Sequence, residues 1–91
     1  MNTIDKMNGY TLTNTNGTWS IETDNNTNVR IIITTIWDKF TRITKACVNI
    51  PATGSIAPEE AANLGEEIIR ASKAANYFTD VIALYENGTL K

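Results

Sequence analysis

The chain has 91 residues, 42% of them hydrophobic and 20% charged, with a formal net charge of −2. This length is enough for one domain with its own hydrophobic core, and the small net charge argues against a surface built to bind polyanions. One cysteine excludes an intrachain disulfide, and no segment approaches the ~18 apolar residues of a membrane span. We therefore expect a single cytoplasmic domain over residues 1–91 that does not contact a membrane.

The segment "YTLTNTNGTWSIETD" predicts an antiparallel β-hairpin. Asn16-Gly17 is the preferred pair for a two-residue type I′ turn, and centring the turn there pairs Thr15 with Thr18. One face of the hairpin is then apolar and the other is polar, which is typical of a sheet that buries one side. The apolar face consists of Tyr10, Leu12, Trp19 and Ile21.

The segment "RIIITTIWDKF" begins a second hairpin, with strands near residues 29–37 and 40–49 and a short turn at Asp38-Lys39. Asp-Lys is not a preferred type I′ pair, so a wider turn stays open. An even-length loop keeps the pairing parity, whereas a three-residue loop would turn one strand over. With a two-residue loop, Trp37 and Phe40 pair on the helix-facing side. The two hairpins together predict a four-stranded antiparallel sheet over residues 10–49.

Residues 57–87 are predicted to form one long helix packed on one face of the sheet. Pro58 suits a first helical turn, and Gly88 suits a C-terminal cap. Apolar residues recur at spacings of three and four, as in a helix with one buried side. They are Ala61, Leu64, Ile68, Ala71, Ala75, Phe78, Ile82 and Tyr85. Beyond Asn76, the alternative is that residues 77–86 form a fifth strand.

No motif for catalysis, cofactor binding or metal binding occurs in the sequence. The chain lacks histidine, which removes the commonest general base and metal ligand, and it lacks phosphate-binding glycine motifs. Adjacent acidic pairs such as Glu66-Glu67 point in different directions on a helix, and Glu66 is placed for an i,i+4 ion pair with Arg70. We therefore expect a protein that is not an enzyme and needs no cofactor or metal.

Nucleic-acid binding is the alternative function, through a basic surface on the second hairpin. Its candidate contacts are Arg30, Lys39, Arg42 and Lys45. Sheets that bind single strands place aromatic rings among such basic residues. In the predicted register the aromatic residues lie on the opposite, helix-packed face, which argues against this function.

Ile32, Ile36 and Ile43 share the face of the second hairpin that the helix does not cover. One exposed isoleucine needs no explanation, but three on neighbouring strands form a patch. The alternative reading is that these residues simply favour strand conformation. Polar strand formers, Thr34 and Thr41, occupy the same face, so we expect the patch to be a protein interface.

A second apolar surface is expected at the end of the helix. A helix of this length would run roughly 43 Å, against about 30 Å for the longest strand. Phe78, Ile82 and Tyr85 would then overhang the sheet and remain unburied. With the isoleucine patch, they predict a homodimer. The rival explanation is a kink near Asn76 that folds the last segment back.

These observations favour a small protein-binding module with a protein partner whose identity the sequence does not give. In size, composition and lack of motifs the chain resembles small phage and mobile-element proteins that inhibit host machinery, including CRISPR inhibitors. That resemblance implies an inhibitor acting by protein contacts, in the host-cell cytoplasm if it is phage-encoded.

Overall fold

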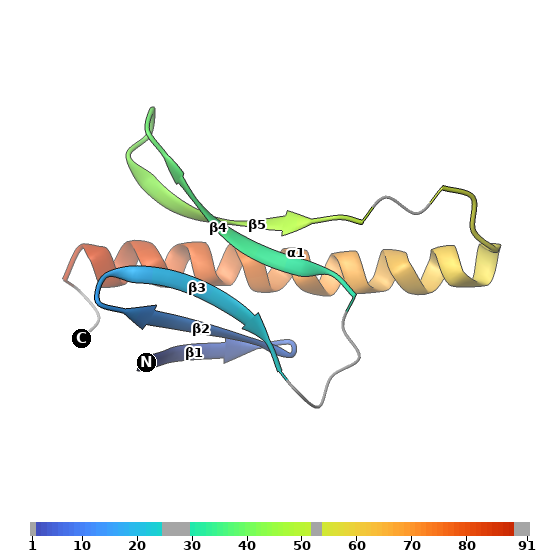
Figure 1. Ribbon diagram of the computed structural model, residues 1–91, viewed down its shortest axis with the longest axis horizontal. Helices are drawn as coiled ribbons and strands as arrows, with labels where there is room; N and C mark the ends of the chain where they lie inside the picture. The colour runs from blue at the N-terminus through green and yellow to red at the C-terminus, as the bar shows by residue number, and fades with distance from the viewer. Residues whose placement is uncertain (1, 25–29, 52–53, 89–91) are drawn as a thin grey trace.

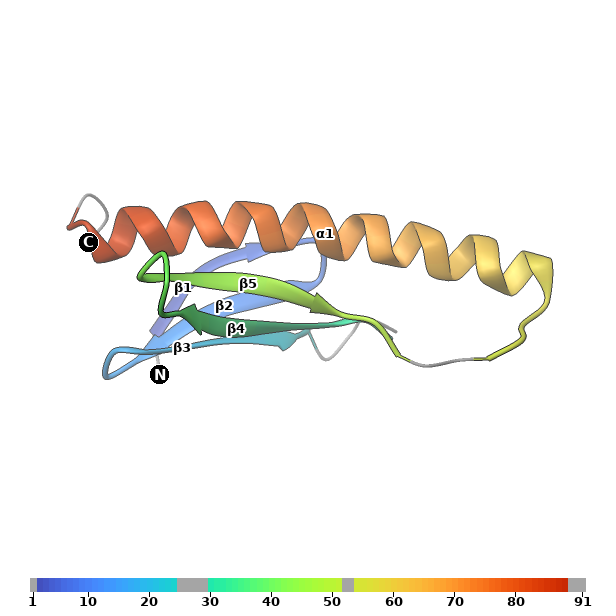
Figure 2. The ribbon, with the colours of Figure 1, turned by 90° about the horizontal axis from the view of Figure 1, so that it is seen from above.

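The protein is described by a computed structural model that covers residues 2–24, 30–51 and 54–88. Along these residues, five strands precede one helix. They are β1 (Asn2–Met7), β2 (Tyr10–Thr15), β3 (Thr18–Thr23), β4 (Ile32–Asp38), β5 (Ile43–Asn49) and α1 (Pro58–Glu86). The fold is α+β with antiparallel pairing, as predicted. The strands lie along one side of α1, as Figure 2 shows.

The first sheet has the order β1-β2-β3 and is joined by two turns of the same type. Asn8 and Gly9 have φ values of 54° and 87°, and Asn16 and Gly17 have 53° and 87°. Positive φ at both central positions defines the type I′ turn, whose twist matches that of the strands it joins. The predicted pairing of β2 with β3 is confirmed, from Thr15 with Thr18 to Tyr10 with Thr23.

Strand β1 is absent from the sequence-based prediction, which began the sheet at residue 10. β1 pairs with β2, and a bulge lies between Thr3 and Asp5. The extra residue at the bulge interrupts the alternation of side chains by which a strand is recognised. Ile4 and Met7 both pack against the core, although their spacing of three does not fit a regular strand.

The second sheet consists of β4 and β5, joined by a four-residue loop over residues 39–42. Trp37 therefore pairs with Thr44, and the predicted two-residue loop that paired Trp37 with Phe40 is wrong. Both loop lengths are even, so the predicted division of the strands into two faces is retained. Residue 29, which was expected in this strand, lies outside the described residues.

The prediction of one four-stranded sheet is also wrong, because no backbone ladder joins β3 to β4. One side-chain hydrogen bond links β3 to β4, and a second links β2 to the residue that precedes β4. The Tyr10 hydroxyl donates to the Ile31 carbonyl oxygen over 2.6 Å, and Thr35 Oγ1 donates to the Trp19 carbonyl oxygen over 3.1 Å. The two sheets therefore meet through side-chain hydrogen bonds rather than through a continuous backbone ladder.

Helix α1 is continuous from Pro58 to Glu86, which excludes the alternative of a last strand over residues 77–86. Pro58 begins the helix, where its missing N–H is not needed. At the other end, the Asn87 and Gly88 amides donate to the Ala83 and Tyr85 carbonyls over 3.0 Å each. Gly88 has a φ of 76°, which fits its predicted role as a cap.

The core lies between the sheets and the C-terminal half of α1. Its buried hydrophobic residues are Tyr10, Leu12, Trp19, Ile31, Ile33, Leu64, Ala71, Ala74, Ala75, Phe78, Val81 and Ile82. The amide of Ala46 in β5 donates to Thr79 Oγ1 over 3.0 Å, which fixes the helix against this strand.

The predicted overhang at the C-terminal end of α1 is wrong. Phe78 and Ile82 are fully buried, and Tyr85 is partly buried with its ring 5.1 Å from that of Trp19. They are therefore core residues rather than an exposed interface. The helix begins beyond the end of β5, so its N-terminal turns project past the sheets (Figure 1). The helix is longer than the strands, as predicted, but the turns that project are at its N-terminal end and not at its C-terminal end.

Candidate protein-binding surface

Large apolar side chains are exposed on β4, β5 and the loop between them. They are Ile32, Ile36, Trp37, Phe40 and Ile43, and we call them the hairpin surface. The exposure predicted for the three isoleucines is confirmed, since each is about half exposed. Trp37 and Phe40 were expected to face the helix, and that expectation is wrong: their exposed fractions are 59% and 89%.

Trp37 is exposed because the helix covers only the beginning of the hairpin. Ile33 lies on the same side of β4 and is fully buried, but Trp37 lies four residues further along the strand. Figure 1 shows the end of the hairpin extending away from α1. Phe40 lies in the loop itself, beyond the last strand pair of Asp38 with Ile43. Both rings therefore face solvent at the projecting end of the molecule.

The loop that presents Phe40 is held by Asp38. Oδ1 of Asp38 accepts hydrogen bonds from the amides of Phe40 (2.9 Å) and Thr41 (3.4 Å), and the Arg42 amide donates to the Asp38 carbonyl over 2.7 Å. Arg42 closes the loop with a φ of 59°. The bond from the Phe40 amide, with the Lys45 ammonium, lowers the pKa of the Asp38 carboxyl to about 2. The loop is thus preorganised at neutral pH.

A shallow hollow of about 480 Å³ lies within the hairpin surface, lined by Ile36, Trp37, Phe40 and Cys47 together with charged neighbours. Cys47 is a free, half-buried thiol. A hollow with aromatic walls can accept an apolar side chain of a partner. The projecting Phe40 ring can in turn insert into a pocket on that partner. This arrangement fits recognition of a protein surface.

The charges at the hairpin end are three cations and one anion. Lys45 Nζ lies 3.2 Å from Asp38 Oδ2, and Lys39 Nζ lies 5.5 Å from the centre of the Phe40 ring. Among the described residues Arg42 has no ion-pair partner. The local excess of positive charge is therefore small, and part of it is already engaged within the hairpin.

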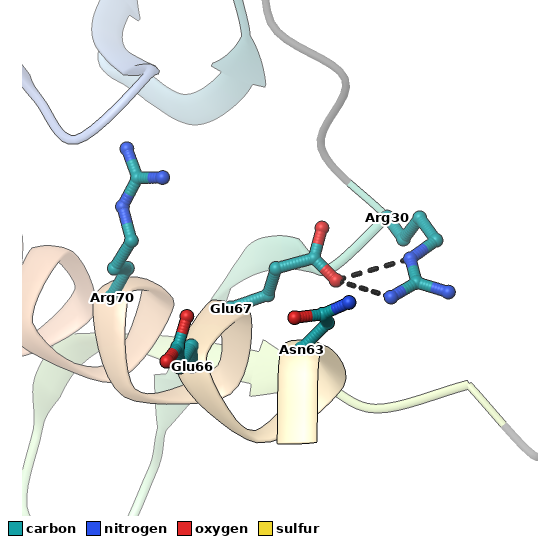
Figure 3. Close-up of a pocket in the computed structure, with 5 residues that line it drawn as sticks. All are labelled: Arg30, Asn63, Glu66, Glu67 and Arg70. Atoms are coloured by element: carbon teal, nitrogen blue, oxygen red, sulfur yellow. Dashed lines mark hydrogen bonds and ion pairs between the residues drawn. The ribbon is translucent and has the colours of Figure 1, made fainter. Parts of the chain in front are cut away.

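Arg30, the fourth predicted nucleic-acid contact, lies apart from the other three. Its guanidinium pairs with Glu67 of α1 at 2.7 Å and with Glu60 at 3.3 Å. Figure 3 shows Arg30 directed at Glu67, with Arg70 pointing away. These residues help to line a hollow of about 410 Å³. The predicted ion pair of Glu66 with Arg70 is not formed. The structure therefore does not gather the four basic residues into one surface.

The described residues contain no cluster of three or more groups able to hold a metal ion. Two tyrosines have raised pKa values, and both shifts have structural causes. Burial raises the pKa of Tyr10, whose hydroxyl is bonded to Ile31, and a hydrogen bond to Asp5 raises the pKa of Tyr77. The Tyr10 hydroxyl is engaged by a backbone carbonyl and the Tyr77 hydroxyl by the Asp5 carboxylate, so each shift is explained by a contact within the fold.

Comparisons of the chain with protein-family models, with curated proteins and with solved structures gave no match. In the part of the chain that the structure describes, α1 is not apolar enough to cross a lipid bilayer. The hairpin surface is therefore the feature of the molecule from which we infer a function.

Proposed function

We propose that the protein is a non-enzymatic binding module that recognises another protein through the hairpin surface. The observation that carries this proposal is the exposure of two aromatic rings, Trp37 and Phe40, on a projecting hairpin that also exposes three isoleucines. Tryptophan is enriched among the residues that dominate binding energies at protein interfaces. Monomeric proteins rarely leave apolar patches of this kind uncovered without a functional reason.

Burying the two rings alone would contribute a large favourable free energy of binding. At their exposed fractions they offer roughly 300 Å² of apolar area, which corresponds to about 7 kcal/mol before the entropy of association is subtracted. The loop is already fixed by Asp38, so little of this is lost to ordering the hairpin on binding. The two rings would therefore supply a substantial part of the free energy of binding.

Nucleic-acid binding remains the second candidate, and one observation favours it. Trp37 and Phe40 are exposed beside Lys39 and Arg42, which is the combination of stacking rings and cations that single strands need. Against it, the isoleucines add aliphatic area with which bases do not stack. Lys45 is paired with Asp38, and the net charge of the chain is −2. The balance favours a protein partner.

At a finer level, we propose that the partner is a host complex and that the chain is a phage or mobile-element inhibitor, by analogy with CRISPR inhibitors. The support is the small size, the lack of catalytic motifs and the projecting apolar hairpin, which can block a surface without chemistry. Expression beside candidate host complexes, with Phe40→Ala as the comparison, tests this part of the proposal. Loss of inhibition in the variant is the expected result, and undiminished inhibition would contradict it.

Photo-crosslinking in cells tests the class of partner. A photoreactive phenylalanine analogue at position 40 preserves an aromatic ring there, and the same analogue at the exposed Leu84 of α1 is the matched control. We expect protease-sensitive, nuclease-resistant adducts from position 40 and few from position 84. Nuclease-sensitive adducts at position 40 would establish the nucleic-acid alternative. Equal yields at the two positions would contradict both functions.

A salt titration provides an independent test of the alternative. Binding to single- and double-stranded nucleic acid is measured for the natural chain and for a Lys39→Ala/Arg42→Ala variant. A nucleic-acid-binding protein loses affinity steeply with added salt, and the slope falls by roughly one for each phosphate contact removed. The protein-binding function predicts no such salt-dependent binding.

A further inference from the structure

The charges of the molecule are divided along its long axis. Residues 37–45, at the end of the β4–β5 hairpin, contain three cations and one carboxylate, a net charge of +2. Helix α1 contains six carboxylates and two cations, a net charge of −4. Four of those carboxylates lie in the first ten residues of α1, and Figures 1 and 2 show this end of the helix far from the hairpin loop. The hairpin end is therefore locally positive on a chain that is negative overall.

Two of the three cations at the hairpin end have no carboxylate partner in the part of the chain that the structure describes. Lys45 Nζ is paired with Asp38, 3.2 Å away. Lys39 Nζ instead lies over the ring of Phe40, 5.5 Å from its centre, and Arg42 is exposed at the end of the loop. Two positive charges are therefore available to a partner beside the most exposed aromatic ring.

Covering the hairpin surface changes the surroundings of Lys39. This residue lines the hollow of about 480 Å³ together with Trp37 and Phe40. A partner side chain that fills the hollow takes water away from the Lys39 ammonium, and burying a cation without a counter-charge is costly. Asp38 is already engaged by Lys45 and by two amides of the loop. A partner that carries a carboxylate beside its apolar side chain offsets the cost.

The small number of free cations favours a protein as the source of the negative charge. Nucleic-acid binding draws much of its affinity from phosphate contacts, with roughly 6–10 of them in a strongly salt-dependent complex, and two free cations can make only about two. A protein needs only one or two well-placed carboxylates around a buried ring, because a few residues dominate the binding energy of an interface. The same two cations disfavour a basic partner through like-charge repulsion.

We infer that the partner contributes a segment that is both apolar and acidic. An apolar side chain of this segment fills the hollow lined by Trp37 and Phe40, and its Asp or Glu side chains pair with Lys39 and Arg42. The negative charge of α1 repels the same segment, so the segment binds at the hairpin end in preference to the helix. This inference rests on the proposed protein-binding function, because it names the chemistry of the partner at the same surface.

Selection from a library of random peptides displayed on cells tests the inference, with the natural chain as bait. We expect the retained peptides to be enriched in Asp and Glu next to apolar residues. Lys39→Glu/Arg42→Asp reverses both free charges, and aspartate tolerates the φ of 59° at position 42 better than most residues. This variant should retain peptides rich in Lys and Arg instead.

Two further variants serve as controls. Lys6→Glu/Lys73→Glu makes the same change in net charge at exposed positions of β1 and α1, and it should keep the preference for acidic peptides. Phe40→Ala removes the aromatic ring and should weaken binding of the retained peptides by at least about 30-fold. Circular dichroism checks that every variant folds, and Lys39→Glu alone replaces the double variant at the hairpin if that variant does not fold.

A coupling measurement on the tightest retained peptide tests the ion pairs themselves. Replacing its Asp and Glu residues by Asn and Gln should weaken binding to the natural chain by about 10-fold or more. The same replacements should not weaken binding to Lys39→Glu/Arg42→Asp, because there the carboxylates face negative charge. Equal losses with both chains would show that the carboxylates do not pair with Lys39 and Arg42.

Retained peptides without an excess of acidic residues would overturn the inference, and so would the retention of no peptide. An acidic preference that survives charge reversal at the hairpin, or that is lost in Lys6→Glu/Lys73→Glu, would overturn it as well. Tighter binding of a single-stranded oligonucleotide than of every retained peptide would overturn it in favour of nucleic acid.

The adducts formed from position 40 test the proposed function separately. Protein adducts there, together with retained peptides that are apolar but not acidic, would refute the acidic segment and leave protein binding in place. The absence of protein adducts from position 40 would refute both.

Discussion

Replacing phenylalanine by alanine at two positions should have very different effects on stability. Phe78 is 0% exposed at the centre of the contact between α1 and the sheets, whereas Phe40 is 89% exposed. Burying a whole phenylalanine side chain removes roughly 200 Å² from water, or about 5 kcal/mol, while the buried tenth of Phe40 is worth roughly 0.5 kcal/mol. With the usual range for core truncations, we expect Phe78→Ala to lose about 3–5 kcal/mol and Phe40→Ala to lose at most ~0.5 kcal/mol.

Urea unfolding followed by circular dichroism measures both values. Both variants are compared with the natural chain at one low protein concentration. A domain of this size has a total stability near 5–10 kcal/mol, so Phe78→Ala can unfold entirely, and Phe78→Leu then provides a milder loss of about 1–1.5 kcal/mol. Similar losses at positions 78 and 40 would refute the packing of the last helical turns against the sheets.

Further substitutions and a pH titration test other parts of the structure. Tyr10→Phe should destabilise the fold by about 1–2 kcal/mol in a urea titration, because it leaves the Ile31 carbonyl without its donor. Gly65→Ala should raise the melting temperature, since an added Cβ meets open space within a helix, whereas Gly17→Ala should lower it because φ is +87°. Asp38 has a folded pKa of about 2, below its ordinary value of 3.8, so its contribution to stability is present above pH 3.8 and is lost as pH falls toward 2. Carboxyl NMR titration should show this pKa staying below 3.8 in Lys45→Met, because the Phe40 amide remains bonded to Asp38.

Local signals in the sequence were sufficient for the central elements of the fold. Asn16-Gly17 determines both the turn and the register of β2 with β3, because few other pairs adopt positive φ at two successive positions. The seam of apolar residues in α1 likewise predicts the helix and its buried side. These features depend on neighbours a few residues apart, which a single sequence contains in full.

Strand β1 could have been predicted from the same turn signal and was not. Asn8-Gly9 repeats the dipeptide of the second turn, and it adopts the same conformation. The alternation that normally marks a strand is broken by the bulge between Thr3 and Asp5. The turn was therefore a better guide to β1 than the pattern of its side chains.

The isoleucine half of the hairpin surface was predictable, and the aromatic half was not. Alternation along β4 is sufficient to place Ile32 and Ile36 on one face, and an even loop keeps Ile43 with them. Whether Trp37 is covered depends on where α1 crosses the sheets, which is a contact between distant segments. For Phe40 a local signal existed, because Asp is favoured at the start of a turn and Asp38 here begins a four-residue loop.

The position of the helix overhang depends on the same long-range geometry. The length of α1 relative to the strands was correctly estimated, but the end that projects is set by where the chain leaves β5. Because the helix begins beyond that strand, its second half returns over the core and buries Phe78 and Ile82. The predicted C-terminal interface is thereby replaced by the hairpin surface as the principal exposed apolar feature.

The burial of Trp37 on complex formation tests the central claim, that protein covers the hairpin surface, most directly. A Trp19→Phe chain retains Trp37 as its one tryptophan, so acrylamide quenching of fluorescence reports on that side chain alone. We predict that the free, dilute protein is readily quenched, and that quenching falls with an emission shift to shorter wavelength when the complex with a partner protein forms. A complex in which Trp37 remains as accessible to acrylamide as in the dilute monomer would contradict the account.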